Sequence, residues 1–275
     1  MDYLEFYGLK EQPFTNSINN RFYYNSTQHS EALLRLKYAV NTMKGLAVLL
    51  GGVGTGKTTL ARRMLDELNE EEYESALLVI IHSSVTAEWL LKKIAMQLGV
   101  DEIPEDKVSL LGKVYHRLVE IHESGKKAVV LIDEAQMLNC RELMEEFRGL
   151  LNLEVPGGKL VSFVFFGLPD LDDVLSLDEP LKQRVAVKFR LKSFTLETTE
   201  EYIKHRLTIA GNSANIFSKE AAETVHLFSR GIPRLINTVC DNALLEGYLM
   251  KKQIIDREIV EEVACDFGLN MEPNA

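Results

Sequence analysis

The feature that most constrains this chain is a glycine-rich loop at residues 51–58. It reads Gly-Gly-Val-Gly-Thr-Gly-Lys-Thr and fits the pattern G-x-x-x-x-G-K-[ST]. An apolar run at residues 46–50 precedes the loop, and residues 58–65 have the composition of a helix. In this order, the loop N–H groups and the positive end of the helix dipole face one point. The sequence therefore predicts a loop that binds nucleotide phosphates.

Each position of this loop has an expected role. Lys57 reaches the β- and γ-phosphates of a bound ATP, and the Thr58 hydroxyl coordinates Mg²⁺. The other expected nucleotide contacts come from the loop backbone and the first helical turn, and they are Gly52, Val53, Gly54, Thr55, Gly56 and Thr59. The expected ligands are therefore ATP and Mg²⁺.

A pair of carboxylates forms the second motif. The apolar residues 128–132 read as a buried strand, and Asp133 and Glu134 follow it directly. Ligands of open α/β sheets bind at the carboxyl ends of the strands, where these side chains lie. We expect Asp133 to hold Mg²⁺ and Glu134 to act as the general base that orients the attacking water.

The pattern of elements changes once along the chain. Strands expected at 76–81, 128–132, 160–166 and 186–191 alternate with helices expected at 28–43, 87–98, 109–123, 142–153 and 170–183. After Ser193 only helices are expected, at 199–210, 218–229, 233–248 and 256–267, with Thr198 and Ser218 as N-caps. This order predicts an α/β fold with a parallel sheet and a P-loop NTPase core over residues 1–193, and an all-helical domain over 194–275.

The expected α/β domain includes an aromatic N-terminal segment at residues 1–27. It is an irregular segment with several apolar anchors, around Phe14, Tyr23 and Tyr24, and not a flexible tail.

The composition of the chain argues against several classes of protein and indicates where in the cell the chain is expected. The net charge of −10 argues against a globally basic nucleic-acid binder. No apolar run approaches the roughly 20 residues that a membrane span needs. The N-terminus carries acids and no basic region, so no signal peptide is expected. Three cysteines without metal-ligand spacing fit a reducing compartment, and a cytoplasmic location is expected.

Two arginines are candidates for stabilising the transition state. Phosphoryl transfer needs positive charge at the transferred group. Arg184 lies just before the last expected strand, and Arg234 follows Pro233 at the start of a helix. Proline in the first turn would fix the direction of Arg234.

Together these residues resemble the AAA+ ATPase superfamily, and more narrowly its secretion ATPases of the ExeA (general secretion pathway protein A) type. Related ATPases of that group serve pilus biogenesis, exosortase-linked polysaccharide export and transposition. The motifs that carry the resemblance are Phe6-Tyr7-Gly8-Leu9 with Pro13-Phe14, Asp133-Glu134-Ala135-Gln136, Gly167-x-Pro169-Asp170-Leu171, Gln183-Arg184 and Gly231-Ile232-Pro233-Arg234-Leu235-Ile236-Asn237.

The resemblance implies a role for each matched residue. Lys57 and Thr58 correspond to the Walker A motif, and Asp133 and Glu134 to Walker B. Arg184 corresponds to an arginine finger that acts on the nucleotide of a neighbouring subunit, which implies an oligomer. Arg234 corresponds to the sensor 2 arginine at the γ-phosphate. The aromatic segment around Phe14, Tyr23 and Tyr24 would border the adenine, and packing of these side chains against the sheet is the open alternative. One position departs from the family, because Leu168 stands where a glutamine is usual, and the sensor 1 residue is left unassigned.

Three hypotheses about function follow. The first is an ATPase that powers or regulates assembly of a secretion, pilus or polysaccharide-export system, held near the inner membrane by a membrane-associated partner. The second is a DNA-dependent ATPase of the transposition type, against which the acidic charge argues. The third is a nucleotide-gated switch with slow turnover, motivated by Leu168.

Overall fold

The computed structural model describes residues 2–17 and 19–269. Its internal contacts divide the chain into two units. The α/β unit comprises Thr27–Gly52 and Lys57–Leu191. The helical unit comprises residues up to Ser26, the loop Val53–Gly56 and residues from Lys192 onward. Each unit has its own buried apolar cluster and is described by itself.

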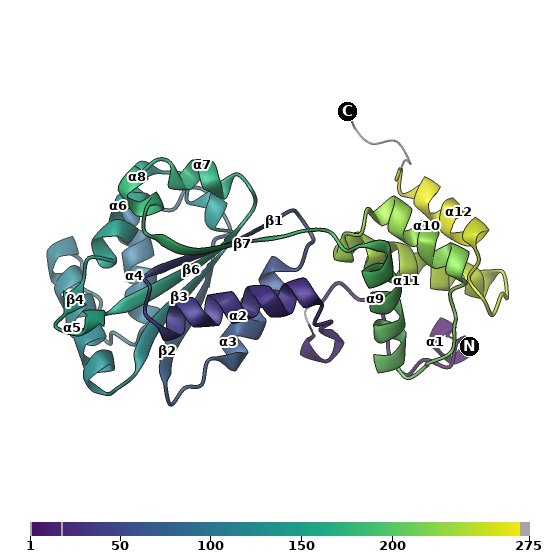
Figure 1. Cartoon of the computed structure of the whole chain (residues 1–275), viewed down its shortest axis with the longest axis horizontal. Coiled ribbons are helices and arrows are strands. Elements are labelled where there is room, and N and C mark those ends of the chain that lie inside the picture. The colour runs from purple at the N-terminus through teal and green to yellow at the C-terminus, as the bar shows by residue number, and fades with distance from the viewer. Residues whose placement is uncertain (1, 18, 270–275) are drawn as a thin grey trace. The chain divides into compact units, whose positions relative to one another are not determined.

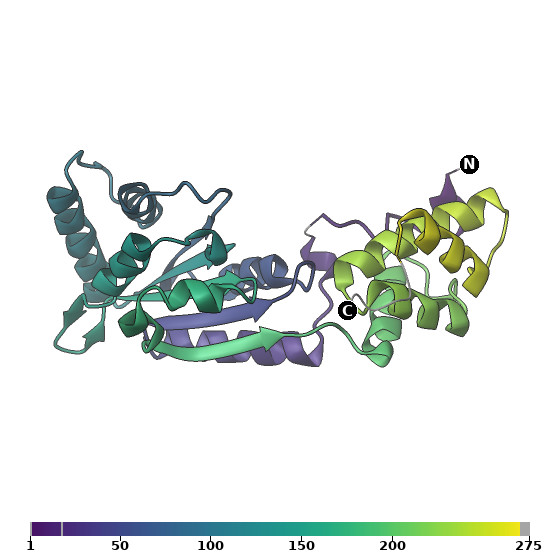
Figure 2. The ribbon, with the colours of Figure 1, turned by 90° about the horizontal axis from the view of Figure 1, so that it is seen from above.

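The α/β unit is built on a parallel sheet (Figure 1). Its strands within the described residues are β1 (Leu46–Gly51), β2 (Tyr73–Val79), β3 (Lys127–Asp133), β6 (Val161–Gly167) and β7 (Val185–Leu191), in the order β2-β3-β6-β1-β7. The three inner strands are apolar and buried along almost their whole length. Polar and apolar residues alternate on β7, which is the edge strand shown in green in Figure 2. An inner parallel strand is covered on both faces, and this burial explains the difference.

Helices cover both faces of this sheet. They are α2 (Thr27–Asn41), α3 (Lys57–Glu67), α4 (Ala87–Gln97), α5 (Lys107–Glu123), α6 (Arg141–Leu150), α7 (Leu171–Leu175) and α8 (Glu179–Lys182). Alternate strand residues such as Val130 and Phe163 share a buried cluster with residues of α4, α5 and α6. The helices α2 and α3 contact β1, β3 and β6. The doubly covered parallel sheet expected from the sequence is confirmed.

Two details of this unit differ from the sequence prediction. The expected helix at 170–183 is two short helices, because the Asp178 side chain accepts a hydrogen bond from the Leu181 N–H and begins α8 as a separate helix. A two-strand hairpin, β4 (Glu154–Val155) with β5 (Gly158–Lys159), follows α6 and was not predicted. Its strands are too short to show a period in the sequence.

The helical unit contains four longer helices and two short N-terminal ones among the described residues. They are α1 (Tyr3–Phe6), η1 (Asn20–Phe22), α9 (Leu196–Ile209), α10 (Lys219–Ser229), α11 (Pro233–Leu249) and α12 (Arg257–Asp266). Ser218 caps α10 as predicted, whereas the N-cap predicted at Thr198 is wrong. Thr195 caps α9 instead, and its hydroxyl accepts a hydrogen bond from the Thr198 N–H.

The N-terminal segment packs with the C-terminal helices. Its assignment to the α/β domain is therefore wrong for residues up to Ser26. The rings of Phe14 and Phe217 are 6.0 Å apart, and Tyr24 lies against Phe194 and Tyr202. The expected packing against the sheet is wrong for Phe14 and Tyr24, because their rings contact residues of the helical unit. The interpretation that these side chains border the adenine stays a prediction. A segment so distant in sequence gives no local signal of the surface it covers.

Within residues 2–17 and 19–269, every helix is too short or too polar to span a membrane.

Candidate nucleotide-binding site

Three strand ends meet at one edge of the sheet. The strand β6 lies between β1 and β3, and all three run parallel. Leu50 of β1 pairs with Gly167 of β6, and Ile132 of β3 pairs with Phe165 of β6. The segments that follow these strands therefore leave the sheet side by side. This is the edge at which ligands of such sheets bind.

Lys57 begins α3 directly after the glycine loop. Its side chain is buried, with the residue 6% exposed, and its Nζ donates a hydrogen bond to the Gly52 carbonyl at 3.0 Å. Gly54 and Gly56 have φ angles of 76° and 100°, which other residues rarely adopt. The glycines thus allow the loop to curl, and the ammonium group stays within reach of the loop backbone.

Asp133 and Thr58 form the part of the site that fits a magnesium ion. Asp133 is fully buried, and burial raises the pKa of its carboxyl above the usual value, against the opposing influence of the Thr58 hydroxyl and the Glu134 N–H. Among the residues that the structure describes, its Oδ2 atom has no hydrogen-bond partner. A buried carboxylate oxygen without a hydrogen-bond partner and a threonine hydroxyl beside the same carboxyl group are oxygen donors of the kind that Mg²⁺ prefers. These residues therefore fit the metal.

Glu134 is held in an unusual backbone conformation. Its φ of 56° and ψ of 37° lie in the left-handed region, which costs a non-glycine residue about 1–3 kcal/mol. Its N–H donates to Asp133 Oδ1 at 3.0 Å, and its Oε2 accepts a hydrogen bond from Gln136 Nε2 at 2.6 Å. The sequence gave no signal for these contacts of Gln136, which was noted there only as part of a motif.

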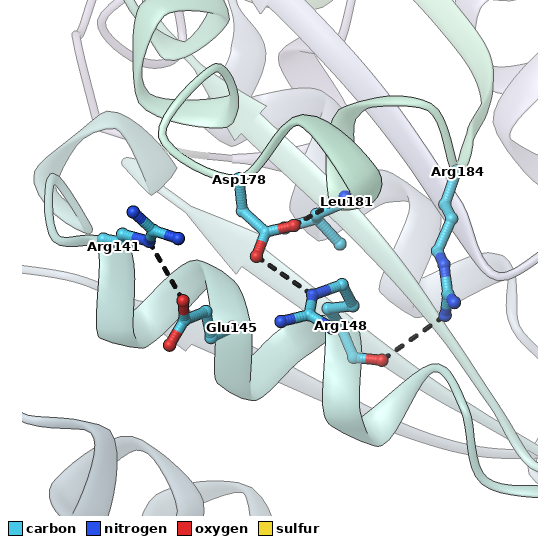
Figure 3. Close-up of polar contacts among 6 residues, drawn as sticks. All are labelled: Arg141, Glu145, Arg148, Asp178, Leu181 and Arg184. Atoms are coloured by element: carbon cyan, nitrogen blue, oxygen red, sulfur yellow. Dashed lines mark hydrogen bonds and ion pairs between the residues drawn. The ribbon is translucent and has the colours of Figure 1, made fainter.

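Arg184 lies at the start of β7, just after α8. Its guanidinium donates from Nη1 to the carbonyl of Arg148 at 3.4 Å, so it rests against the last turn of α6. Figure 3 shows both arginines with Asp178, and a separate ion pair between Arg141 and Glu145 of α6. Arg141 Nε lies 3.0 Å from Glu145 Oε1. The sequence gave no signal for Arg148 and Asp178, because neither residue belongs to a motif that the sequence predicted.

Arg234 belongs to the helical unit. It occupies the first turn of α11 behind Pro233, and its side chain is exposed. Its backbone N–H donates to the carbonyl of Gly54, a loop residue grouped with that unit, at 3.3 Å. A Cβ atom on Gly54 would lie 2.8 Å from the Cβ of Arg234, so a larger residue would not fit there.

Comparison with known sequences gives three findings. Residues 40–175 match a family described as an AAA domain. The chain is 37% identical over 253 residues to general secretion pathway protein A of Aeromonas hydrophila, a match that covers 90% of this chain and 45% of that protein. It is 25% identical over 256 residues to ORC1-type DNA replication protein 3 of Sulfurisphaera tokodaii, covering 84% and 62% of the two chains. The chain thus spans less than two thirds of each of these relatives.

Comparison with solved structures supports the fold. The Aeropyrum pernix ORC2 protein, solved with ADPNP and ADP, superposes with a TM-score of 0.69 at 14% identity, covering 94% of this chain and 72% of that one. The Thermotoga maritima RuvB Holliday junction branch migration motor gives 0.61 at 20% identity, covering 95% and 75%. At these identities the likeness concerns the fold.

Proposed function

Because this chain is an AAA+ P-loop protein related to general secretion pathway protein A, we propose that it binds ATP with Mg²⁺ and hydrolyses it to ADP and phosphate. One observation supports this most strongly. Lys57 and Thr58 at the start of α3 lie at the same edge of the sheet as Asp133 and Glu134 at the end of β3. A phosphate-binding lysine, a metal-binding pair and a carboxylate base are thus provided by the α/β unit.

The chemistry follows from these positions. The backbone N–H groups of residues 52–57 and the Lys57 ammonium bind the phosphates, and the first turn of α3 with Thr58 and Thr59 adds the positive end of a helix dipole. Thr58 and Asp133 would hold Mg²⁺, which when bound would neutralise charge on the phosphates. Glu134 accepts a proton from the attacking water as the general base. Arg184 of a neighbouring copy and Arg234 stabilise the transferred phosphate.

The direct test compares two lysine variants. Replacing Lys57 with alanine removes the phosphate-binding ammonium, and we expect Lys57→Ala to lose ATP binding in an equilibrium titration with a fluorescent ATP analogue. Lys44→Ala is the matched control, because Lys44 is exposed and lies outside the loop. Unchanged affinity in Lys57→Ala would reject the site.

The finer proposal concerns the system that the ATPase serves. The similarity to general secretion pathway protein A supports a role in powering or regulating assembly of a secretion, pilus or polysaccharide-export system. The protein then works in the cytoplasm, peripheral to the inner membrane through a membrane-associated partner. An arginine finger acts across subunits, so the active form is an oligomer of this chain.

DNA is the partner in a second candidate function. It is favoured by the similarity to a protein named as an ORC1-type DNA replication protein, and opposed by the net charge of −10. Steady-state ATPase rates over a range of protein concentrations, with and without double-stranded DNA, separate the two. A rate per subunit that rises with concentration and ignores DNA supports the secretion-type role. Strong stimulation by DNA, lost at higher salt, supports the second.

A third candidate is a switch that binds ATP and turns it over slowly. Leu168 motivates it, because this residue offers no polar side chain at the end of β6. A single-turnover experiment with excess protein measures the chemical step without product release. A slow chemical step with tight binding would support the switch.

A further inference from the structure

Gln136 links the end of β3 to the end of β6. It lies in η2 (Ala135–Met137), the short turn that follows Glu134, and it is buried, with 8% of its surface exposed. Its Nε2 donates to Glu134 Oε2 at 2.6 Å, and its Oε1 accepts from the Leu168 N–H at 3.1 Å. One amide therefore bridges a carboxylate and the backbone after a neighbouring strand.

The orientation of this amide is fixed by chemistry. A backbone N–H can only donate, so the amide oxygen must face Leu168. An ionised carboxylate can only accept, so the amide NH₂ group must face Glu134. Both contacts therefore require the same orientation. A flipped amide would place two donors together at Leu168 and two acceptors together at Glu134.

The space for the amide comes from a glycine. A Cβ atom on Gly167 would lie 3.0 Å from Gln136 Oε1 and 2.7 Å from a methyl group of Leu171. The absence of a side chain at Gly167 lets Gln136 approach the end of β6. Three features of the sheet edge thus determine where the Glu134 carboxylate lies. They are the left-handed backbone of Glu134, the hydrogen bond from the Gln136 amide, and the space that Gly167 leaves for that amide.

We propose that Gln136 is a positioning residue for hydrolysis, which holds the Glu134 carboxylate by its Oε2 atom and ties that position to the backbone of Leu168. A hydrogen bond to a charged acceptor is of the strong kind, and this one is partly buried. It leaves Glu134 Oε1 as the oxygen that faces the attacking water. This inference rests on the proposed role of Glu134 as the general base.

The test uses a variant that keeps the volume of the side chain. Gln136→Met has nearly the same length and cannot hydrogen-bond, while Gln97→Met is the matched control at an exposed glutamine of α4. We expect kcat of Gln136→Met to fall by roughly 10- to 100-fold, because small misplacements of catalytic groups cause rate losses of this size. The ATP dissociation constant stays within about 2-fold, because the hydrogen bonds of Gln136 go to Glu134 and Leu168 and not to the phosphate-binding loop.

A double-mutant cycle shows whether Gln136 acts through Glu134. In the Glu134→Ala background, adding Gln136→Met should leave the residual rate unchanged, since the bonded partner is already gone. Urea unfolding of the nucleotide-free proteins gives a second readout, in which the two substitutions should be non-additive. If Gln136→Met fails to fold, Gln136→Glu keeps the shape and replaces the donor with an acceptor, and the same loss of kcat is expected.

The outcomes separate the two ideas. Loss of turnover in Glu134→Ala with wild-type kcat in Gln136→Met would overturn this inference and leave the proposed base intact. A rise of kcat in Gln136→Met would overturn it too, because the amide would then restrain the base. Wild-type turnover in Glu134→Ala would reject the base and this inference with it.

Discussion

Arg148 and Asp178 form an ion pair between α6 and the start of α8, with Arg148 Nε 2.9 Å from Asp178 Oδ2 (Figure 3). The Asp178 side chain is 4% exposed, and its other oxygen accepts the Leu181 N–H at 2.8 Å. One carboxylate thus both caps α8 and ties it to α6. The same arginine provides the carbonyl on which Arg184 rests. The pair therefore fixes the segment that carries the proposed arginine finger.

Substitutions at Asp178 separate its two contacts. Asparagine caps a helix as well as aspartate does, so Asp178→Asn loses only the ion pair, whereas Asp178→Ala loses both. We expect Asp178→Ala to lower the free energy of unfolding by about 2 kcal/mol, and Asp178→Asn by clearly less. Urea unfolding measures both, with exposed Asp173→Asn as the control. Equal losses in the two variants would show that the cap contributes nothing.

The arginine finger is tested by mixing inactive proteins. Arg184→Ala should bind ATP normally and lose turnover, because Arg184 is proposed to act on the nucleotide of a neighbouring copy. Glu134→Gln should also bind ATP and lose turnover. A mixture of the two should regain part of the activity, since some interfaces then combine an intact base with an intact finger. Absence of recovery at every ratio would argue that Arg184 acts within its own subunit or not at all.

The buried Arg206 holds the N-terminal segment on α9. Its Nε and Nη2 atoms donate to the carbonyls of Pro13 and Thr15, and its guanidinium lies 4.7 Å from the centre of the Phe22 ring. We expect Arg206→Met to destabilise the protein by about 2–3 kcal/mol, because two carbonyls lose their donors. Arg206→Lys should lower the free energy of unfolding by nearly as much, since an ammonium group cannot reproduce the planar set of donors of a guanidinium.

Hydrogen exchange at residues 11–17 and 19–22 locates the effect of Arg206. The amides of this segment should exchange faster in Arg206→Met, while those of β3 and β6 stay protected. Faster exchange throughout the chain would contradict a local role.

We expect His226 to make the helical unit less stable in acid. Its Nδ1 lies 2.9 Å from the Thr199 hydroxyl, which itself donates to the Thr195 carbonyl. Burial lowers the pKa of His226 below its usual value. The unfolded chain, with a histidine pKa of about 6.5, then binds the proton more readily, so stability is present above that pH and is lost as the pH falls through the folded-state pKa.

The measurement for His226 is the thermal midpoint at pH 7.5 and pH 5.5. We expect the midpoint of the wild type to fall between these values by more than that of His226→Gln, whose side chain does not titrate. An equal fall in both proteins would show that other groups account for the acid sensitivity.

The motif-bearing part of this site was predictable from the sequence because its signals are local. The loop at Lys57 and the pair after β3 each combine an apolar strand with polar residues at its end, and the confirmed parallel sheet brings such ends together. The separation of an α/β core from a helical region also follows from the pattern, and the helical unit resumes at Lys192 beside the expected boundary.

The contacts that sequence missed depend on tertiary structure. Gln136 reaches Leu168 only because β6 lies between β1 and β3, an order that strand periodicity does not give. The N-terminal aromatics pack into the buried cluster of the helical unit through long-range contacts, such as that of Phe14 with Phe217. A pattern of apolar residues indicates that a segment is buried, and it leaves open which surface covers it.

We propose above all that the α/β unit hydrolyses ATP with Glu134 as the base. The most direct measurement is phosphate release by Glu134→Gln beside the wild type, with ATP affinity measured on the same samples. We expect binding within about 2-fold of the wild type and a turnover reduced by at least roughly 100-fold, as for the loss of a general base. Wild-type turnover in Glu134→Gln, or no hydrolysis by the wild type at any protein concentration, would contradict the account.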